Sequence, residues 1–250
     1  MLFAFARLLL IAISALLCLF LAIFGLRFLG EAQRYSEFNH PLVTTHPWII
    51  ADGGNLDAGP KQSLVALKSA AESSPEIFLA LTIRISHDDE KWVLFDHKQS
   101  RENMLAFEDA LKALPNARFY IIIDQPGGNK LDDIFTLIKN FQLEDSVVLT
   151  SPFADTLREI RNKSARWLTG ASTSEATKAQ FMTSLFLETM VDLPGDVFIV
   201  EKFRPRLFTE LSRRKKVLIF KTDDPTALAR VRSEFSQVGV LTTRPSLFGK

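Results

Sequence analysis

Cysteine is almost absent from this chain: Cys18 is the only one in 250 residues. A single cysteine excludes a disulfide within the chain and a metal site built on several thiolates. An excess of charge of one sign is also lacking, since 30 Lys and Arg face 29 Asp and Glu, for a formal net charge of +1. Bulk electrostatics therefore indicate no nucleic acid or other polyanion as a partner.

The sequence also lacks internal repeats, low-complexity segments and the Gly-rich loop that cradles phosphates in P-loop proteins. The Gly pair in QPGGN, residues 125–129, is typical of a turn instead. Hydrophobic residues make up 47% of the chain, which is enough for a sizeable core.

One long hydrophobic run is present, at residues 8–26, and it holds no charge between Arg7 and Arg27. About nineteen residues at 1.5 Å each give a helix of roughly 28 Å, the thickness of one hydrocarbon core. A cleaved signal has a shorter apolar region and a small-x-small cleavage site, which LRFLGEAQ lacks. We therefore expect residues 1–30 to be a single-pass membrane anchor, with a cleaved signal or a buried core helix as alternatives.

The orientation of this anchor depends on a weaker signal. Arg7 precedes the run, while Arg27 and Arg34 follow it, so the count of positive charges does not decide. Long domains cross membranes largely regardless of their charge. We expect the N-terminus inside and the following domain on the extracytoplasmic side.

Beyond a polar tether at residues 31–46, strand and helix patterns alternate to the end of the chain. Apolar strand patterns lie at residues 47–51, 77–85 with an extension at 91–95, 118–124, 146–150, 166–171, 196–200, 216–220 and 238–243. Helical patterns lie at residues 60–72, 102–114, 131–141, 154–162, 174–190, 205–214 and 224–235, with Pro60 in the first turn of the first of them.

This alternation predicts right-handed βαβ units and a parallel sheet. Eight such strands in residues 47–250 favour a closed (β/α)₈ TIM-type barrel, with a doubly wound open sheet as the alternative. The functional face of a barrel lies where its strands end. The residues to examine there are 52–57, 82–86, Asp96, His97, Asp124, Gln125, Ser151, Ser172, Glu201, Lys202, 221–223 and 242–244.

Several motifs follow the strands. The first strand leads into Asp52-Gly53-Gly54, and a loop then reaches Pro60-Lys61-Gln62-Ser63. VLFDH, LTSPF and TTRP follow later strands. From about Trp48 to Phe248 the chain resembles the glycerophosphodiester phosphodiesterase family, a barrel of the PLC-like phosphodiesterase superfamily.

The resemblance implies a site that this chain has largely replaced. In that family two His act as general acid and base, and carboxylates hold a divalent cation. The family's His-Arg-Gly corresponds to Asp52-Gly53-Gly54, and its Glu-x-Asp places Ala80 and Thr82 at the carboxylate positions. Its Glu-x-Lys corresponds to Ile122 and Asp124, and its His-Asp pair stands reversed as Asp96 and His97.

The motif residues that shape the family's loops and turns are kept better than its catalytic and metal-binding residues. The chain keeps the Gly and the Pro of the opening motif, the Ser-Phe turn at Ser151 and the Arg-Pro end at Arg244. The long excursion that forms a lid over the substrate in the family is missing, because a helical pattern follows Asp96 almost at once. The resemblance therefore implies a pseudoenzyme that binds without turning over.

A rebuilt site is the alternative. Asp52, Asp96, Asp124 and Glu201 all follow strands, where unopposed acids would raise one another's pKa. Asp52, Asp96 and Asp124 are the candidate ligands for Ca²⁺ or Mg²⁺, and Asp52, Asp96 and His97 are the candidate catalytic groups of an active phosphodiester hydrolase. Alternatively, Lys61, Arg84, Lys202 and Lys221 balance the four acids and leave a neutralised polar mouth.

The favoured interpretation needs no cofactor. A membrane-tethered barrel binds a phosphate-bearing or lipid-derived ligand, or a protein partner. Cationic side chains hold anionic groups as point charges or as forks. The predicted ligand-binding residues are Lys61, Arg84, Ser151, Lys221 and Arg244.

Overall fold

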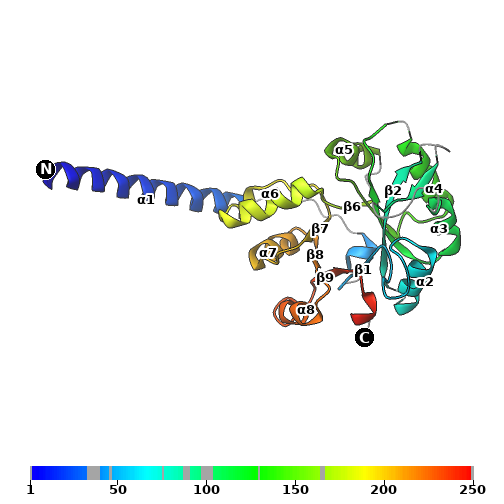
Figure 1. Cartoon of the computed structure of the whole chain (residues 1–250). Coiled ribbons are helices and arrows are strands. Elements are labelled where there is room, and N and C mark those ends of the chain that lie inside the picture. Colours follow the sequence, from blue (N-terminus) through cyan, green and yellow to red (C-terminus); the bar gives the residue numbers. More distant parts are fainter. Residues whose placement is uncertain are drawn as a thin grey trace.

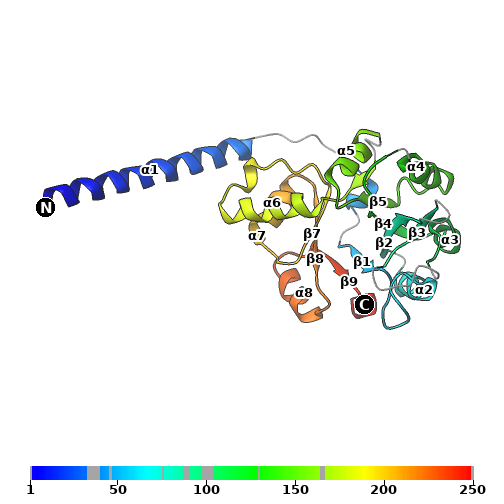
Figure 2. The same ribbon diagram turned by 45° about the horizontal axis from the view of Figure 1, so that its top comes forward.

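The computed structural model describes residues 2–32, 40–44, 47–74, 76–86, 91–96, 104–128, 130–163 and 167–248. A long N-terminal helix, α1 (Leu2–Ala32), projects from a rounded domain of strands and helices (Figure 1). Helices surround the strands of that domain, as the turned view in Figure 2 also shows.

The domain is built on one sheet of parallel strands. Its order is β6-β5-β4-β2-β1-β9-β8-β7, and each of these strands runs parallel to its neighbours. The strands are β1 (Ile49–Asp52), β2 (Phe78–Ile85), β3 (Trp92–Leu94), β4 (Arg118–Ile123), β5 (Val147–Thr150), β6 (Leu168–Thr169), β7 (Val197–Val200), β8 (Val217–Lys221) and β9 (Gly239–Thr242). β3 lies off this path, paired with β2.

The two edges of this sheet meet, so the sheet forms a barrel. Gly170, directly after β6, forms a parallel bridge with Val197 at the start of β7. The Ala171 amide donates to the Val197 carbonyl at 2.7 Å, and the Asp196 amide donates to the Thr169 carbonyl at 2.7 Å. The predicted (β/α)₈ barrel is confirmed, and the doubly wound open sheet is excluded.

The helices fill the connections between successive strands. They are α2 (Leu64–Ser73), α3 (Phe107–Ala113), α4 (Leu131–Asn140), α5 (Ala154–Lys163), α6 (Thr173–Ser184), α7 (Pro205–Arg213) and α8 (Pro225–Arg232), with short 3₁₀ turns η1 (Pro41–Thr44), η3 (Glu188–Met190) and η4 (Pro245–Leu247). Ser63 and Ser172 accept hydrogen bonds at the starts of α2 and α6. Pro225, one residue after the capping Asp224, begins α8.

Alternation along each strand divides the core into an inner and an outer part. On β2, Leu79, Leu81 and Ile83 pack outward beneath the helices. Phe78 and Ala80 face the barrel interior with Tyr120 of β4. Below them, the Trp48 ring stacks on Phe78 with centroids 4.4 Å apart and fills the base of the barrel.

Several predicted element boundaries are wrong. α2 begins at Leu64 rather than Pro60, because Gln62 adopts a positive φ of 62° that a helix cannot contain. α3 begins at Phe107, since Ala106 forms a bridge to Val93 of β3. β3 turns back antiparallel to β2 instead of extending it.

The predicted helical region at residues 174–190 is interrupted. α6 ends at Ser184, and η3 follows after Phe186, which has a positive φ of 62°.

α1 is long and apolar enough to cross a membrane over Leu9–Glu31, and none of its most apolar window is buried. Part of the predicted tether, residues 33–39 and 45–46, lies outside the described residues. Within the described part, Leu42 of η1 is buried against the base of the barrel, and the Trp48 indole donates to its carbonyl at 3.0 Å. The limits of anchor, tether and barrel remain predictions.

Candidate functional site

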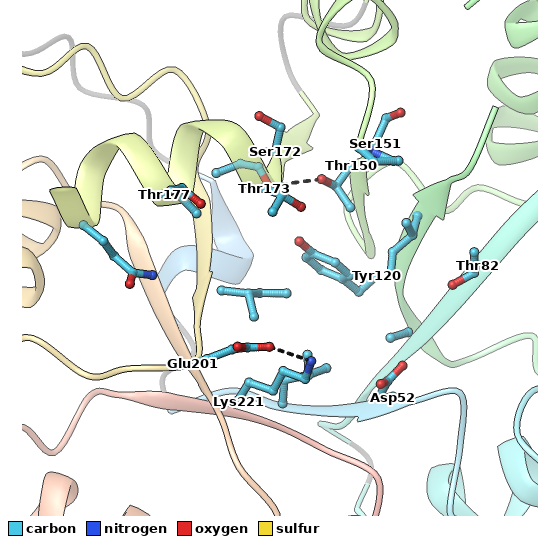
Figure 3. Close-up of a pocket in the computed structure, with 18 of the residues that line it drawn as sticks. Asp52, Thr82, Tyr120, Thr150, Ser151, Ser172, Thr173, Thr177, Glu201 and Lys221 are labelled. Atoms are coloured by element: carbon cyan, nitrogen blue, oxygen red, sulfur yellow. Dashed lines mark hydrogen bonds and ion pairs between the residues drawn. The ribbon is translucent and has the colours of Figure 1, made fainter. Parts of the chain in front are cut away.

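A cavity of about 690 Å³ opens where the barrel strands end (Figure 3). Residues from all eight barrel strands, or from the turns after them, reach it. Its walls are formed by Asp52, Lys61, Ala80, Thr82, Tyr120, Ile122, Thr150, Ser151, Pro152, Ala171, Ser172, Thr173, Ala176, Thr177, Gln180, Ile199, Glu201, Lys202, Lys221 and Leu241.

The turn after β1 builds the first wall. Gly53 and Gly54 have φ values of 73° and 102°, a region that side chains disfavour. A Cβ on Gly53 would also meet the Lys61 side chain, which folds back over it. In that position the Lys61 ammonium lies 2.7 Å from the Asp52 carboxylate, so the two form an ion pair at the cavity edge.

Gln62 fastens this turn to the two strands beside it. Its side-chain amide donates to the Phe95 carbonyl at 2.8 Å and accepts from the Thr82 amide at 3.2 Å. Its own amide donates to the Gly53 carbonyl at 2.7 Å. The buried Gln62 side chain therefore takes the place of strand pairing where β1 has already ended.

The opposite wall is rich in hydroxyl groups. Figure 3 shows Tyr120, Thr150, Thr173 and Thr177 around the cavity, from β4, β5 and α6. Burial raises the pKa of the Tyr120 phenol, while a hydrogen bond with Thr150 partly opposes this. The phenol therefore stays protonated at neutral pH, and this wall offers neutral donors and acceptors rather than charge.

Charge in the cavity comes from three lysines and two carboxylates. Lys221 at the end of β8 lies 3.1 Å from Glu201, which follows β7, and both side chains are exposed. Within the described part of the chain, Lys202 is not paired with any acidic side chain. The lining therefore holds one lysine beyond its two ion pairs.

The start of α6 is held rigidly beside the cavity. Ser172 and Glu175 form a reciprocal capping box, and Arg161 binds the Glu175 carboxylate with two nitrogens at 2.7 and 3.0 Å. Burial alone would raise the pKa of Glu175, but the bonds from Arg161 and Ser172 lower it below its usual value. Glu175 therefore stays ionised and fixes the position of Thr173 and Thr177.

Four of the predicted site residues do not line the cavity. The Arg84 guanidinium lies over the Phe95 ring at 5.2 Å, and Arg244 pairs with Asp57 at 3.3 Å. Asp96 and Asp124 follow β3 and β4 and are half-buried outside the lining. Of the predicted residues, Asp52, Lys61, Ser151 and Lys221 do come together, along with Glu201 and Lys202.

Ser151 lines the cavity but also holds the local backbone. Its hydroxyl donates to the Ile123 carbonyl at 2.8 Å and accepts from the Phe153 amide at 3.1 Å. Its Oγ therefore already serves as donor and acceptor within the turn. The surviving Ser-Phe motif thus serves the geometry of the mouth.

The candidate metal and catalytic residues remain predictions. Among the described residues, no group of three or more Asp, Glu, His and Cys side chains is arranged to hold a metal ion. His97, a candidate catalytic group, lies outside the described residues.

Sequence reasoning missed the hydroxyl wall. Tyr120 and Ile122 occupy alternate positions of β4, so both face the interior. The same alternation could have identified Tyr120 as a lining residue, because Ile122 had been placed at a motif position. Thr173 and Thr177 are separated by one helical turn, but nothing in their spacing distinguished them from surface residues.

No protein-family model and no curated protein matches the sequence. Solved structures do match. A glycerophosphodiester phosphodiesterase from Agrobacterium tumefaciens superposes with a TM-score of 0.63 at 12% identity, over 81% of this chain and 99% of that one. The chain has the fold of the glycerophosphodiester phosphodiesterases.

Two further structures carry the same fold. A glycerophosphoryl diester phosphodiesterase domain from Mycobacterium tuberculosis matches with a TM-score of 0.62 at 12% identity, over 82% of this chain and 98% of that one. A phosphodiesterase from Oleispira antarctica, solved with its product sn-glycerol-3-phosphate, matches with a TM-score of 0.61 at 10% identity, over 82% and 96%.

Several residues that the sequence motifs singled out lie in the cavity wall. Ala80, Thr82 and Ile122, which we predicted at the carboxylate positions of the family, all line the cavity. Asp52, which we predicted at the position of the first motif His, forms the ion pair with Lys61.

Proposed function

We propose that this chain is a membrane-anchored protein of glycerophosphodiester phosphodiesterase fold that binds a phosphate-bearing or lipid-derived ligand without hydrolysing it. The observation that supports this most is the wall formed by Ala80, Thr82 and Ile122. Methyl groups and a neutral hydroxyl are poor ligands for a hard divalent cation. Asp52, the acidic residue nearest to them in the first motif, is paired with Lys61.

The remaining lining suits an anionic polyol. Lys202 and Lys221 supply positive charge, while Thr150, Thr173 and Thr177 supply hydroxyls for phosphate or glycerol oxygens. A volume of about 690 Å³ is that of a small-molecule site. These features support a binding role, whether the ligand regulates the protein or a protein partner.

Calorimetry on the full chain in lipid nanodiscs tests this role, with sn-glycerol-3-phosphate and inorganic phosphate as probes. We expect saturable binding of sn-glycerol-3-phosphate. Lys202→Ala should weaken it roughly tenfold or more, because a charge-assisted hydrogen bond is lost. Lys68→Ala, an exposed lysine on α2, is the matched control and should change nothing. Equal binding by both variants and wild type would contradict a cavity site.

The side of the membrane is a separate proposal. We place the barrel on the extracytoplasmic side. An impermeant protease added to intact cells should then digest the barrel. Digestion only after the cells are opened would place the barrel in the cytoplasm.

A further inference from the structure

An exposed apolar surface lies at the end of α6. It consists of Phe181, Leu185, Phe186 and Met190, which are 60%, 45%, 48% and 40% exposed, and we call it the α6–η3 patch. Four large apolar side chains this close together on an outer face mark an interaction surface. Among the described residues, Arg206 lies over one of them, with its guanidinium 3.8 Å from the centroid of the Phe186 ring.

The C-terminal end of α1 is docked beside this patch. In both Figures 1 and 2, α1 leaves the barrel at the end of α6. Thr189 of η3 donates from its hydroxyl to the Arg27 carbonyl at 3.3 Å, and Arg27 lies 3.6 Å from the Glu188 carboxylate. Gly30 allows this contact, since a Cβ there would lie 2.6 Å from the Thr189 hydroxyl.

Buried charges hold the docking corner together. Glu210 of α7 accepts from Arg213 at 2.7 Å and from Arg214 at 2.6 Å. Arg214 also donates to the carbonyls of Val191 and Thr189 at 2.7 and 3.0 Å, while Arg213 donates to the Glu31 carbonyl at 3.2 Å. These bonds tie the end of α1 to η3 and α7, so the patch keeps a fixed place relative to the helix.

The contacts of α1 set the height of the patch above the membrane. Its charge-free run ends at Leu26, and Arg27 is the first charge after it. The first charged residue of a span lies in the headgroup region, where aromatic side chains also gather. Because η3 contacts Arg27 and Gly30, the patch lies at that same level.

We propose that the α6–η3 patch rests in the interfacial region of the lipid bilayer crossed by α1. This inference rests on the proposed role of α1 as a membrane anchor. A cationic side chain beside the patch suits this position. The Arg206 guanidinium lies 3.8 Å above the Phe186 ring, where it can contact lipid phosphates while the ring contacts acyl chains. Lipid is the occupant because α1, the proposed anchor, contacts η3 directly beside the patch.

Tryptophan quenching by brominated lipids in nanodiscs, with one full chain per disc, tests the contact. The native Trp48, Trp92 and Trp167 are only 1%, 6% and 8% exposed, so they form a protected background. Phe186→Trp places a probe in the patch. Phe153→Trp is the matched control, because Phe153 is a Phe that is 38% exposed just after β5 and does not belong to the patch.

We expect lipids brominated near the headgroup to remove most of the emission added by Phe186→Trp and to leave that of Phe153→Trp unchanged. Leu185→Trp is a second probe with the same expectation, should Phe186→Trp fold poorly. Equal quenching at the patch and at Phe153, or no quenching at the patch, would overturn the proposal. If the chain stays with the discs but the patch probes are not quenched, the patch proposal fails while the proposed anchor stands. If the chain separates from the discs, the proposed anchor is contradicted as well.

Discussion

At the scale of single residues, Gly170 shows how closely the barrel interior is packed. A Cβ at this position would lie 2.5 Å from the Tyr120 hydroxyl and 2.7 Å from the Thr150 Cβ. We expect Gly170→Ala to reduce the free energy of unfolding by about 1–3 kcal/mol, the usual cost of overpacking. Chemical denaturation measures this, with Gly59→Ala as control because its nearest neighbour is the Ser63 hydroxyl at 3.2 Å. Equal stabilities of the two variants would contradict the close packing at barrel closure.

His40, which lies beside the base of the barrel, should make the free energy of unfolding depend on pH. Burial lowers the pKa of its imidazole below the usual 6.5, and Asp145 and Asp196 offset this only in part. The unfolded chain therefore takes up a proton first as the pH falls through about 6.5, so stability should decline between pH 7 and pH 5. His40→Asn retains an acceptor for the Leu42 amide and should remove this component in denaturation curves. An unchanged pH dependence in the variant would show that His40 is not its source.

At the scale of elements, Gln62 joins three strands: its side chain bonds to β2 and to the residue after β3, and its backbone amide bonds to the turn after β1. Gln62→Ala leaves the Thr82 amide and the Phe95 carbonyl without this partner, which should cost about 2–4 kcal/mol of unfolding free energy. Gln142→Ala is a matched control, because Gln142 also has a positive φ, of 54°, but is exposed. Denaturant midpoints of the two variants should differ clearly. A small effect at Gln62 would mean that strand pairing alone holds the mouth.

Helices and strands were predictable from the sequence where the hydrophobic periodicity was strong. Their boundaries were predicted wrongly where a single residue determines them. The apolar strands and amphipathic helices were predicted correctly in number and order. The start of α2 was wrong because Pro60 looked like a first helical residue, whereas the left-handed Gln62 delays the helix to Leu64. Antiparallel β3 was missed because pairing direction leaves no mark in a short apolar run.

At the scale of the whole molecule, α1 and the barrel make one unit. We expect the full chain to stay in membranes after high-salt and alkaline washes, because burying about nineteen apolar residues outweighs any surface attraction. Fractionation followed by blotting checks this, and a variant lacking residues 2–26 should be released. A soluble product of the full-length gene that begins near Glu31 would show a cleaved signal instead.

The barrel was predictable as a whole, but its cavity was predictable only in part. Strand ends placed Asp52, Lys61 and Lys221 together, because all parallel strands end at one face. The same rule brought in Asp96 and Arg84, which lie outside the lining. Asp96 follows β3, which runs antiparallel to β2, and the Arg84 guanidinium lies over the Phe95 ring. Side-chain direction within a turn depends on tertiary contacts that no local pattern records.

The central claim is that the cavity binds without hydrolysis, and one assay tests it most directly. The full chain in nanodiscs is incubated with a glycerophosphodiester and Ca²⁺ or Mg²⁺, and ³¹P NMR follows the diester and any phosphomonoester. We predict that the diester signal shifts on binding while no monoester forms above the protein-free control. General acid–base catalysis is worth roughly 10²–10⁴-fold and a metal ion several kcal/mol, and our prediction is that Ala80, Thr82 and Ile122 in the cavity wall supply neither. Metal-dependent monoester formation that disappears in Asp96→Ala would contradict the account and identify Asp52, Asp96 and His97 as a rebuilt catalytic site.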